Sequence, residues 1–275
     1  MEEEYKLREI RKEIFLTAYH GNSSAAHLAS AYSIVEILYT LYCKHVLNFK
    51  ASDPQWEARD RLILSKGHAS LALYSILSQV GFIDKAVLKT FCYPDSHLGG
   101  EPNMLEVPGV EATTGALGHG LSYGIGIALG LKMNRNHAKV YVIIGDGECQ
   151  EGSIWEGVMS AHRYQLDNLI VIMDCNKMQK MDFVYNTMQI DEWQGKWASF
   201  GWAVDTVDGH NVEELQQCLQ NGSVKGKPRI IIANTVKGHG VSIMENNVKW
   251  HYKMPSKKEL KVFVQELGIL QEELS

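Results

Sequence analysis

The chain contains little of what marks a disulfide-bonded, membrane-inserted or nucleic-acid-binding protein. Its five cysteines are odd in number and form no Cys-x-x-Cys pair, which argues against a disulfide framework and gives no zinc site. No apolar run approaches the roughly 20 residues that a transmembrane helix needs. The acidic residues 1–6 do not resemble a signal peptide, so we expect a cytoplasmic protein. The net charge of -5 gives no reason to expect nucleic acid or an anionic membrane as a partner.

The order of apolar segments predicts a single α/β domain over residues 1–275. Helices are expected in residues 1–50 and in a C-terminal tail, residues 255–275. Between them, apolar, β-branched runs alternate with helical segments, of which residues 71–80 and 113–132 are the clearest. The expected strands are residues 59–65, 139–144, 168–175, 202–207 and 229–234. This alternation predicts a doubly wound, mostly parallel sheet with helices on both faces, which binds ligands at the carboxyl ends of its strands.

Two polar residues follow neighbouring strands of this predicted sheet. Asp146, within Gly145-Asp146-Gly147-Glu148, comes directly after one strand, and Asn176 comes directly after the next. A strand, a crossover helix and a parallel strand need about thirty residues, so the two strand ends should lie side by side. A carboxylate and an amide oxygen are hard ligands suited to Mg²⁺. Gly147 permits close approach of a ligand, and the following helix offers N–H groups to an anion. The pattern predicts a site for a magnesium diphosphate.

The glycine-rich segment from Gly118 to Gly124 is one residue away from the dinucleotide-binding pattern G-x-G-x-x-G. No convincing strand directly precedes it, and Asp146 does not occupy a ribose-binding position. These mismatches argue against a nicotinamide cofactor. Close helix packing is the simpler interpretation of most of the four helical glycines, Gly120, Gly124, Gly126 and Gly130.

The string from Gly145 to Glu156, GDGECQEGSIWE, together with Asn176, resembles the thiamine diphosphate signature of transketolases. It is most similar to the short transketolases whose enzyme is split into two chains. The resemblance covers nearly the whole chain and implies the diphosphate-binding, or PP-type, domain. It implies thiamine diphosphate and Mg²⁺, with Ca²⁺ or Mn²⁺ as substitutes. The chain would transfer a two-carbon ketol unit from a ketose phosphate to an aldose phosphate. It would act only with a C-terminal subunit carrying the pyrimidine-binding domain, in a heterotetramer.

The same resemblance assigns roles to individual residues. His27, His68 and His251 match active-site histidines that handle substrate and protons, and His68 and His251 also lie near the cofactor. Asp146, Asn176 and the main-chain carbonyl of Met178 match the metal ligands. The remaining matches are Gly115, Ala116, Leu117, Gly147 and Glu148 at the cofactor, and Glu151 and Glu156 in a carboxylate network between subunits.

Two departures from the family pattern concern the donor substrate. Glu101 stands where transketolases usually have a histidine that touches the donor, and His97 lies four residues earlier as a possible substitute. Near His27, the usual Gly-His-x-Gly has become Ala26-His27-Leu28-Ala29. A carboxylate repels a carboxylate-bearing donor but accepts hydrogen bonds from sugar hydroxyls. Two alternatives therefore stay open: a related thiamine enzyme using an α-keto acid such as pyruvate, and a non-catalytic protein that retains the fold.

Overall fold

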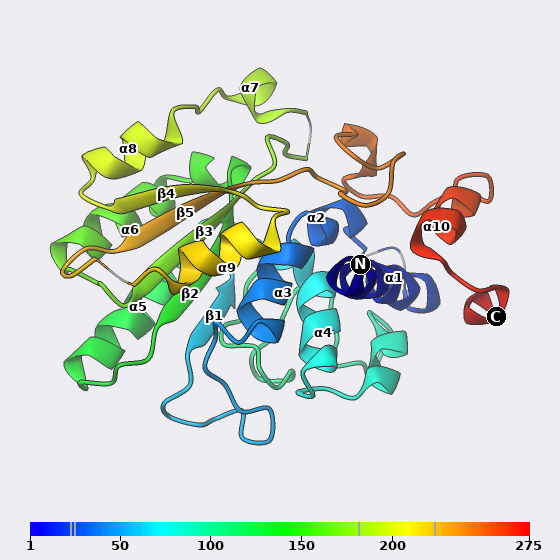
Figure 1. The fold of residues 1–275 in the computed structure, drawn as a ribbon, viewed down its shortest axis with the longest axis horizontal. Helices are drawn as coiled ribbons and strands as arrows, with labels where there is room; N and C mark the ends of the chain where they lie inside the picture. Colours follow the sequence, from blue (N-terminus) through cyan, green and yellow to red (C-terminus); the bar gives the residue numbers. More distant parts are fainter. Residues whose placement is uncertain (23, 25, 181, 223) are drawn as a thin grey trace.

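Five parallel strands form one sheet in the order β1-β2-β3-β5-β4 (Figure 1). The structure, a computed structural model, describes residues 1–22, 24, 26–180, 182–222 and 224–275. The strands are β1 (Arg61–Leu64), β2 (Val140–Gly145), β3 (Leu169–Cys175), β4 (Ala203–Asp208) and β5 (Arg229–Asn234). All but β4, which lies at one edge, are almost wholly buried, and this explains why they read as continuous apolar runs.

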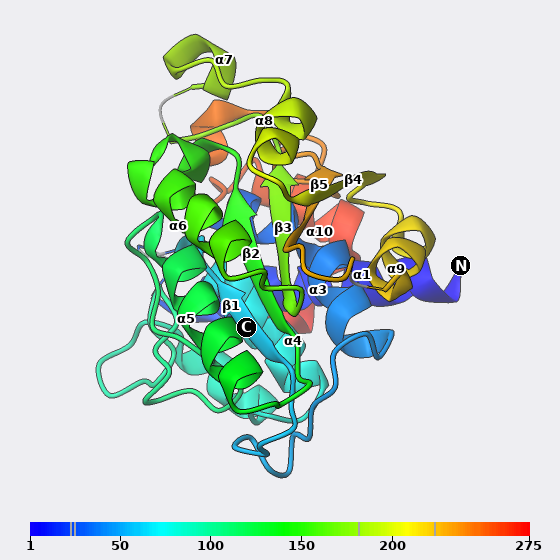
Figure 2. The same ribbon diagram turned by 90° about the vertical axis from the view of Figure 1, so that its left-hand side faces the viewer.

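Helices cover both faces of the sheet, which confirms the predicted fold class (Figure 2). One face carries α5 (His119–Met133), α6 (Gly152–Arg163) and α8 (Trp193–Ser199), which pack with Val140, Val142 and Ile144. The other face carries α1 (Glu2–His20), α3 (Val35–Cys43), α4 (Ser70–Gln79) and α9 (Val212–Gln220), which pack with Tyr141 and Ile143. Alternate residues of β2 thus enter two separate cores, as the two-residue period of a strand requires.

The remaining helices are short. They are α2 (Leu28–Tyr32), α7 (Val184–Thr187), α10 (Leu260–Leu267) and 3₁₀ turns at Gly67–Ala69, Lys85–Thr90, Gly147–Gln150, Val248–Trp250 and Gln271–Leu274. The helical tail expected over residues 255–275 is interrupted, because Gly268 adopts φ +66 and ends α10. The described part of residues 1–50 holds the three helices α1, α2 and α3, in keeping with the helices expected there. The tail packs back on α1 through Phe263 and Phe15, whose ring centroids are 5.0 Å apart. The single-domain organisation stays a prediction.

The start of α5 also differs from the prediction. The helix begins at His119 rather than at residue 113, because Gly118 has φ +84 and interrupts the regular backbone. Gly120 and Gly124 are packed as expected: a Cβ at either would overlap Ser65 or Val142. Gly126 and Gly130 have nothing within 4 Å of an added Cβ, so the close-packing interpretation is wrong for these two.

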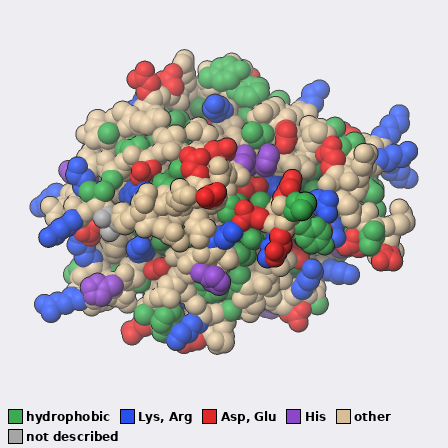
Figure 3. Space-filling model, in the orientation of Figure 1, with side chains coloured by type: hydrophobic (Ala, Val, Ile, Leu, Met, Phe, Trp, Pro, Cys, Tyr) green, Lys and Arg blue, Asp and Glu red, His purple; other side chains and the backbone are tan. Residues whose placement is uncertain are grey.

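The surface carries charges of both signs. Asp and Glu side chains are interspersed with Lys and Arg over the face shown in Figure 3, in keeping with the small net charge. Among the described residues, no helix combines the length and the apolar character that crossing a membrane requires.

Candidate functional site

The ends of β2 and β3 bring Asp146 and Asn176 to the same edge of the sheet. Gly145 pairs with Asp174 in the strand register, and the main-chain N–H of Asp146 donates to the carbonyl of Asp174 at 3.3 Å. Both side chains, of Asp146 and of Asn176, are buried. The Asp146 carboxylate accepts the N–H of Gly147 at 2.8 Å and that of Lys177 at 2.6 Å. The structure therefore places the two oxygen-bearing residues together where the sequence predicted them.

Asp174 orients the Asn176 amide. The Asn176 Nδ2 donates to Asp174 Oδ2 at 2.7 Å, while Oδ1 accepts the N–H of Met178 at 3.0 Å. This arrangement fixes which end of the amide is the nitrogen and leaves a lone pair of the oxygen for a cation. Met178 is itself buried in the turn after β3, where it bridges to Phe183.

Asp174, which sequence reasoning missed, is fully buried beneath the site. Its carboxylate accepts hydrogen bonds from Ser33 and Thr235 and forms an ion pair with buried Lys66. Burial alone would raise the pKa of Asp174, but Lys66 and the surrounding hydrogen-bond donors hold it below its usual value. The signal was a charged residue inside an otherwise apolar strand, Leu169–Cys175, because such a residue needs a partner.

The donor set fits a hard divalent cation. Asp146 offers a buried carboxylate, and burial followed by the nearby charge of Asp174 raises its pKa to about 7. A divalent ion would neutralise the Asp146 carboxylate, and the Asn176 oxygen adds the neutral oxygen ligand that such ions accept. Metal binding by Asp146, Asn176 and Met178 stays a prediction that this arrangement supports.

Three histidines predicted from far-apart motifs form a cluster at the same edge, here called the histidine cluster. The ring centroid of His27 lies 5.4 Å from that of His68 and 5.2 Å from that of His251, and the last two are 5.9 Å apart. His68 follows β1, His27 precedes α2, and His251 follows the loop after β5. Tyr252 packs on His27, with ring centroids 4.8 Å apart.

The surroundings keep the histidine cluster neutral. Burial, followed by the charge of Lys66, lowers the pKa of His68 well below its usual value, and burial also lowers that of His27. Burial and Lys237 lower the pKa of His251 to about 3. The Lys237 ammonium is buried and lies 2.9 Å from His251 Nδ1. Burial, together with the charge of Lys66, lowers the Lys237 pKa to about 8.

Hydrogen bonds select a tautomer for two of the rings. His27 Nδ1 contacts the main-chain carbonyl of His251 at 3.1 Å, and a carbonyl can only accept, so Nδ1 carries the proton and Nε2 is an acceptor. An ammonium can only donate, so Lys237 leaves His251 Nδ1 without a proton and Nε2–H as a donor. One ring of the cluster thus presents a hydrogen-bond acceptor while a neighbouring ring presents a hydrogen-bond donor.

Residues 114–118 form a loop held against the strand ends. Thr114 donates through its hydroxyl to the carbonyl of Leu64 at 2.7 Å, and Glu148 accepts the N–H groups of Gly118 at 2.8 Å and Gly145 at 3.0 Å. Ser65 also donates to the buried Glu148 carboxylate. Glu148 therefore positions the loop through internal hydrogen bonds. Ala116 and Leu117, by contrast, are exposed and available to a ligand.

Glu101 lies against Gly115, whose backbone has φ +147. A Cβ at Gly115 would overlap the Glu101 carboxylate. The segment before Glu101 is anchored by α4, because Ser70 donates to the carbonyl of Gly100 at 2.7 Å and Tyr74 to that of Gly99 at 3.0 Å. Glu101 is exposed, as is His97.

Glu151 and Glu156 are also exposed. Glu156 lies on α6, and Glu151 lies immediately before that helix.

Comparisons with known proteins agree with this geometry. A family model described as the thiamine diphosphate-binding domain of transketolase matches residues 17–274. One of the subunits of apulose-4-phosphate transketolase from Actinobacillus succinogenes is 40% identical over 265 residues, which are 96% of this chain and 95% of that protein. The 6-deoxy-6-sulfo-D-fructose transketolase subunit SqwG of a Clostridium species is 37% identical, over 90% of each chain.

Longer transketolases match over part of their length. Human transketolase is 37% identical over 89% of this chain but only 39% of its own. The crystal structure of transketolase from Campylobacter jejuni superposes with a TM-score of 0.86 and 30% identity, covering 98% of this chain and 45% of that one. The chain thus spans less than half the length of these two proteins. Its resemblance to transketolases, found first in the sequence, is confirmed: the chain belongs to the transketolase family, enzymes that transfer ketol groups, and carries the family's thiamine diphosphate-binding domain.

Proposed function

We propose that this chain is the diphosphate-binding subunit of a two-chain, Mg²⁺-dependent transketolase of the cytoplasm. The observation that carries the proposal is the meeting of Asp146 and Asn176 at adjacent strand ends. The histidine cluster lies at the same edge of the sheet. A non-catalytic scaffold has no need of buried, oriented oxygen ligands and neutral imidazoles at one edge. The five free thiols are consistent with a reducing compartment.

In this proposal, Asp146, Asn176 and the carbonyl of Met178 hold Mg²⁺, and the exposed Ala116 and Leu117, with Gly115, face the cofactor. Bound thiamine diphosphate supplies the electron sink that lets the carbon–carbon bond beside a ketose carbonyl break and re-form. Gly147 lets the backbone approach the diphosphate closely. Glu148 keeps the loop of residues 114–118 in place from inside the protein.

The histidine cluster orients the sugar and moves protons. His27 presents a free acceptor nitrogen and His251 a free N–H donor. These two groups can bind opposite ends of a hydroxyl network or accept and return one proton. Their lowered pKa values keep both rings neutral near pH 7, the state in which His27 Nε2 can accept a proton and His251 Nε2–H can donate a hydrogen bond. His68 completes the cluster next to the loop of residues 114–118.

A partner chain supplies the pyrimidine-binding domain. Support comes from relatives of similar length that are named as transketolase subunits. The exposed Glu151, directly before α6, and Glu156, on α6, fit a carboxylate network that continues into neighbouring subunits of a heterotetramer. We infer that cofactor binds between the two kinds of chain and that this chain alone turns over nothing.

The donor is a ketose, in keeping with the sugar-derived substrates in the names of the relatives. Glu101 bears on this choice, because its exposed carboxylate next to Gly115 repels an α-keto acid and accepts hydrogen bonds from sugar hydroxyls. Glu101 and the exposed His97 are therefore the residues of this chain that we assign to the donor side of the site.

Reconstitution with the partner chain, thiamine diphosphate and Mg²⁺ tests the proposal. We expect transfer of a two-carbon unit from a ketose phosphate to an aldose phosphate, detected as an aldose two carbons shorter than the donor and a ketose two carbons longer than the acceptor. The same mixture should release no carbon dioxide from pyruvate. Decarboxylation of pyruvate without ketol transfer would replace this function with the α-keto acid alternative. Turnover by this chain without its partner would refute the split site.

A further inference from the structure

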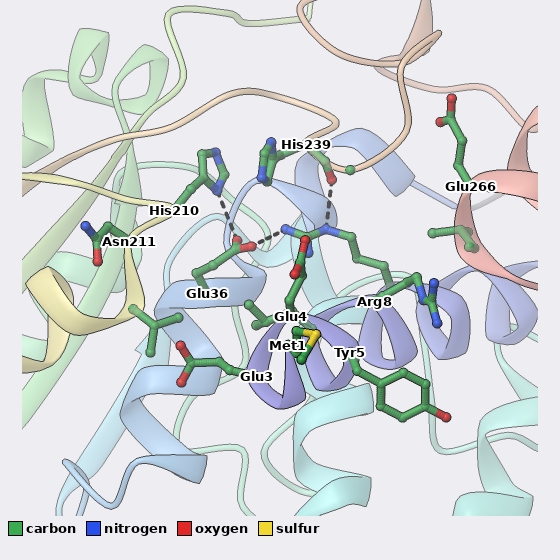
Figure 4. A pocket seen from close by; sticks show the side chains of 15 residues that line it. Met1, Glu3, Glu4, Tyr5, Arg8, Glu36, His210, Asn211, His239 and Glu266 are labelled. Atoms are coloured by element: carbon green, nitrogen blue, oxygen red, sulfur yellow. Dashed lines mark hydrogen bonds and ion pairs between the residues drawn. The ribbon is translucent and has the colours of Figure 1, made fainter.

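A second group of charged and imidazole side chains lies at the ends of β4 and β5. Glu36 of α3 and His210 of the loop after β4 point toward one another, with His239 alongside (Figure 4). His210 Nδ1 lies 3.0 Å from Glu36 Oε2, and Arg11 of α1 pairs with the other oxygen of Glu36. The rings of His210 and His239 stack with centroids 3.8 Å apart. We call Arg11, Glu36 and His210 the Arg11–Glu36–His210 network.

The network fixes the protonation of His210. Burial alone would raise the pKa of Glu36, but Arg11 and His210 lower it to about 2, so Glu36 is an ionised acceptor. His210 Nδ1 must then carry the proton in this contact. His210 Nε2 accepts the main-chain N–H of Val236 at 2.8 Å. Both nitrogens of the ring are thus in use, Nδ1–H as a donor and Nε2 as an acceptor.

Val236 belongs to the segment that reaches into the proposed active site. The residue before it, Thr235, donates through its hydroxyl to buried Asp174, and the residue after it, Lys237, lies 2.9 Å from His251 Nδ1. The next N–H, that of Gly238, donates to the carbonyl of Ala29 at 3.0 Å. The side chains of Thr235 and Lys237, on either side of Val236, thus point toward the proposed active site. The Val236 N–H donates to His210 and links this segment to the network.

We propose that His210 is a positioning residue, which acts through the Val236 main chain to hold the Lys237 ammonium against His251 and so to set the tautomer of that ring. Without an acceptor at His210, the Val236 N–H loses its partner, and the segment relaxes to find another. Lys237 then moves away from His251 Nδ1. Without this donor, the Nε2–H tautomer of His251 is no longer favoured over the Nδ1–H tautomer. The inference rests on the proposed function only in that the histidine cluster serves the reaction.

A metal ion is the competing use of this cluster. One ligand atom each from Glu36, His210 and His239 lie within 4.8 Å of one another. However, both ring nitrogens of His210 and both oxygens of Glu36 already have partners, and the Arg11 cation adjoins them. An ion would have to displace the Val236 N–H or the His210 proton, so the hydrogen-bonded network accounts for these residues without one.

The tautomer of His251 can be read by ¹⁵N NMR of the full chain with labelled histidine, near neutral pH and without substrate or cofactor. We expect one tautomer, Nε2–H, in the unsubstituted protein. His210→Phe keeps the ring stack but removes the acceptor, and both His251 tautomers should then be populated. His210→Gln retains an acceptor for the Val236 N–H and should restore the single tautomer.

The matched control is His20→Phe, which also removes a contact between a ring nitrogen and a main-chain group, here the carbonyl of Glu273 at 2.7 Å. It should leave the tautomer of His251 unchanged. Should His210→Phe not fold, Glu36→Gln provides the same readout by removing the charge that fixes the His210 proton. A folded His210→Phe in which His251 keeps Nε2–H alone would overturn the proposal, as would Zn²⁺ bound by His210 in the unsubstituted protein. Failure of ketol transfer would instead count against the proposed function, since this measurement involves no turnover.

Discussion

At the scale of single residues, the site depends on a buried ion pair, Lys66–Asp174, that lies beneath the proposed metal ligands. Lys66 and Asp174 are almost completely buried, and Asp174 in turn orients the Asn176 amide. Isolated charges inside a protein are costly, and a pair is retained only when its partners satisfy it. Asp174 has four such partners, Ser33, Lys66, Asn176 and Thr235, which lie in four different segments of the chain. The pair therefore links the stability of the fold to the geometry of the metal site.

Lys66→Met removes the cation and leaves Asp174 charged and buried. We expect a loss of about 3–5 kcal/mol in the free energy of unfolding, measured by urea denaturation. Lys132→Met is the matched control, because the pair of Lys132 with Asp167 at 2.9 Å is partly exposed. Lys132→Met should lower the free energy of unfolding by no more than about 1 kcal/mol. Equal losses of stability in the two variants would show that the buried Lys66–Asp174 pair contributes no more to stability than a partly exposed pair.

At the scale of elements, α5 shows how one helix uses its glycines in two ways. Gly124 faces the sheet, where Val142 leaves no room for a side chain, whereas Gly126 faces away into open space. The helix can therefore approach β2 closely on one side only. The sequence predicted close packing for most of the helical glycines without distinguishing these two positions, because spacing alone does not tell which side of a glycine-rich helix meets the sheet.

Alanine at these two positions should have opposite effects on stability. Gly124→Ala should lower the free energy of unfolding by about 1–3 kcal/mol, since overpacking forces the helix and β2 apart. Gly126→Ala should raise it by up to about 1 kcal/mol, because alanine favours the helix and meets no atom. Thermal unfolding of the two variants and of the unsubstituted chain measures both changes in stability. Destabilisation by Gly126→Ala would contradict the orientation of α5 described here.

Several features of the molecule could be predicted from the chain alone, and the reasons differ. The strand Arg229–Asn234 matches its predicted range because buried parallel strands are continuous apolar runs with sharp ends. Asp146 and Asn176 could be paired because a short crossover separates them. The interactions of Asp174 and of the Arg11–Glu36–His210 network could not be predicted, because each includes a contact between residues more than a hundred positions apart in the sequence. The start of α5 was misplaced because the left-handed backbone at Gly118 leaves no mark in the hydrophobic pattern.

At the scale of the whole molecule, Glu36 joins α1, α3 and the loop after β4. Its folded-state pKa of about 2 lies below the ordinary value of 4.5. A lowered carboxyl pKa stabilises the fold above pH 4.5, and this contribution is lost as the pH falls toward 2. The difference between these two pKa values corresponds to about 3 kcal/mol in the free energy of unfolding.

Urea denaturation at several pH values checks this contribution. The stability advantage of the unsubstituted chain over Glu36→Gln should shrink by about 3 kcal/mol between about pH 5 and pH 2. Comparing the two proteins removes the effect of all other carboxylates. An advantage that does not change with pH would show that Glu36 is not held ionised by its neighbours.

The proposed function requires that Asp146 and Asn176 bind a divalent ion together with thiamine diphosphate. Calorimetric titration of thiamine diphosphate into this chain with its partner, with Mg²⁺ or with a chelator, tests that claim most directly. We predict saturable binding that requires Mg²⁺ and that weakens at least about tenfold, or 1.4 kcal/mol, in Asp146→Asn. Binding that is equally tight without a divalent ion, or unaffected by Asp146→Asn, would contradict it.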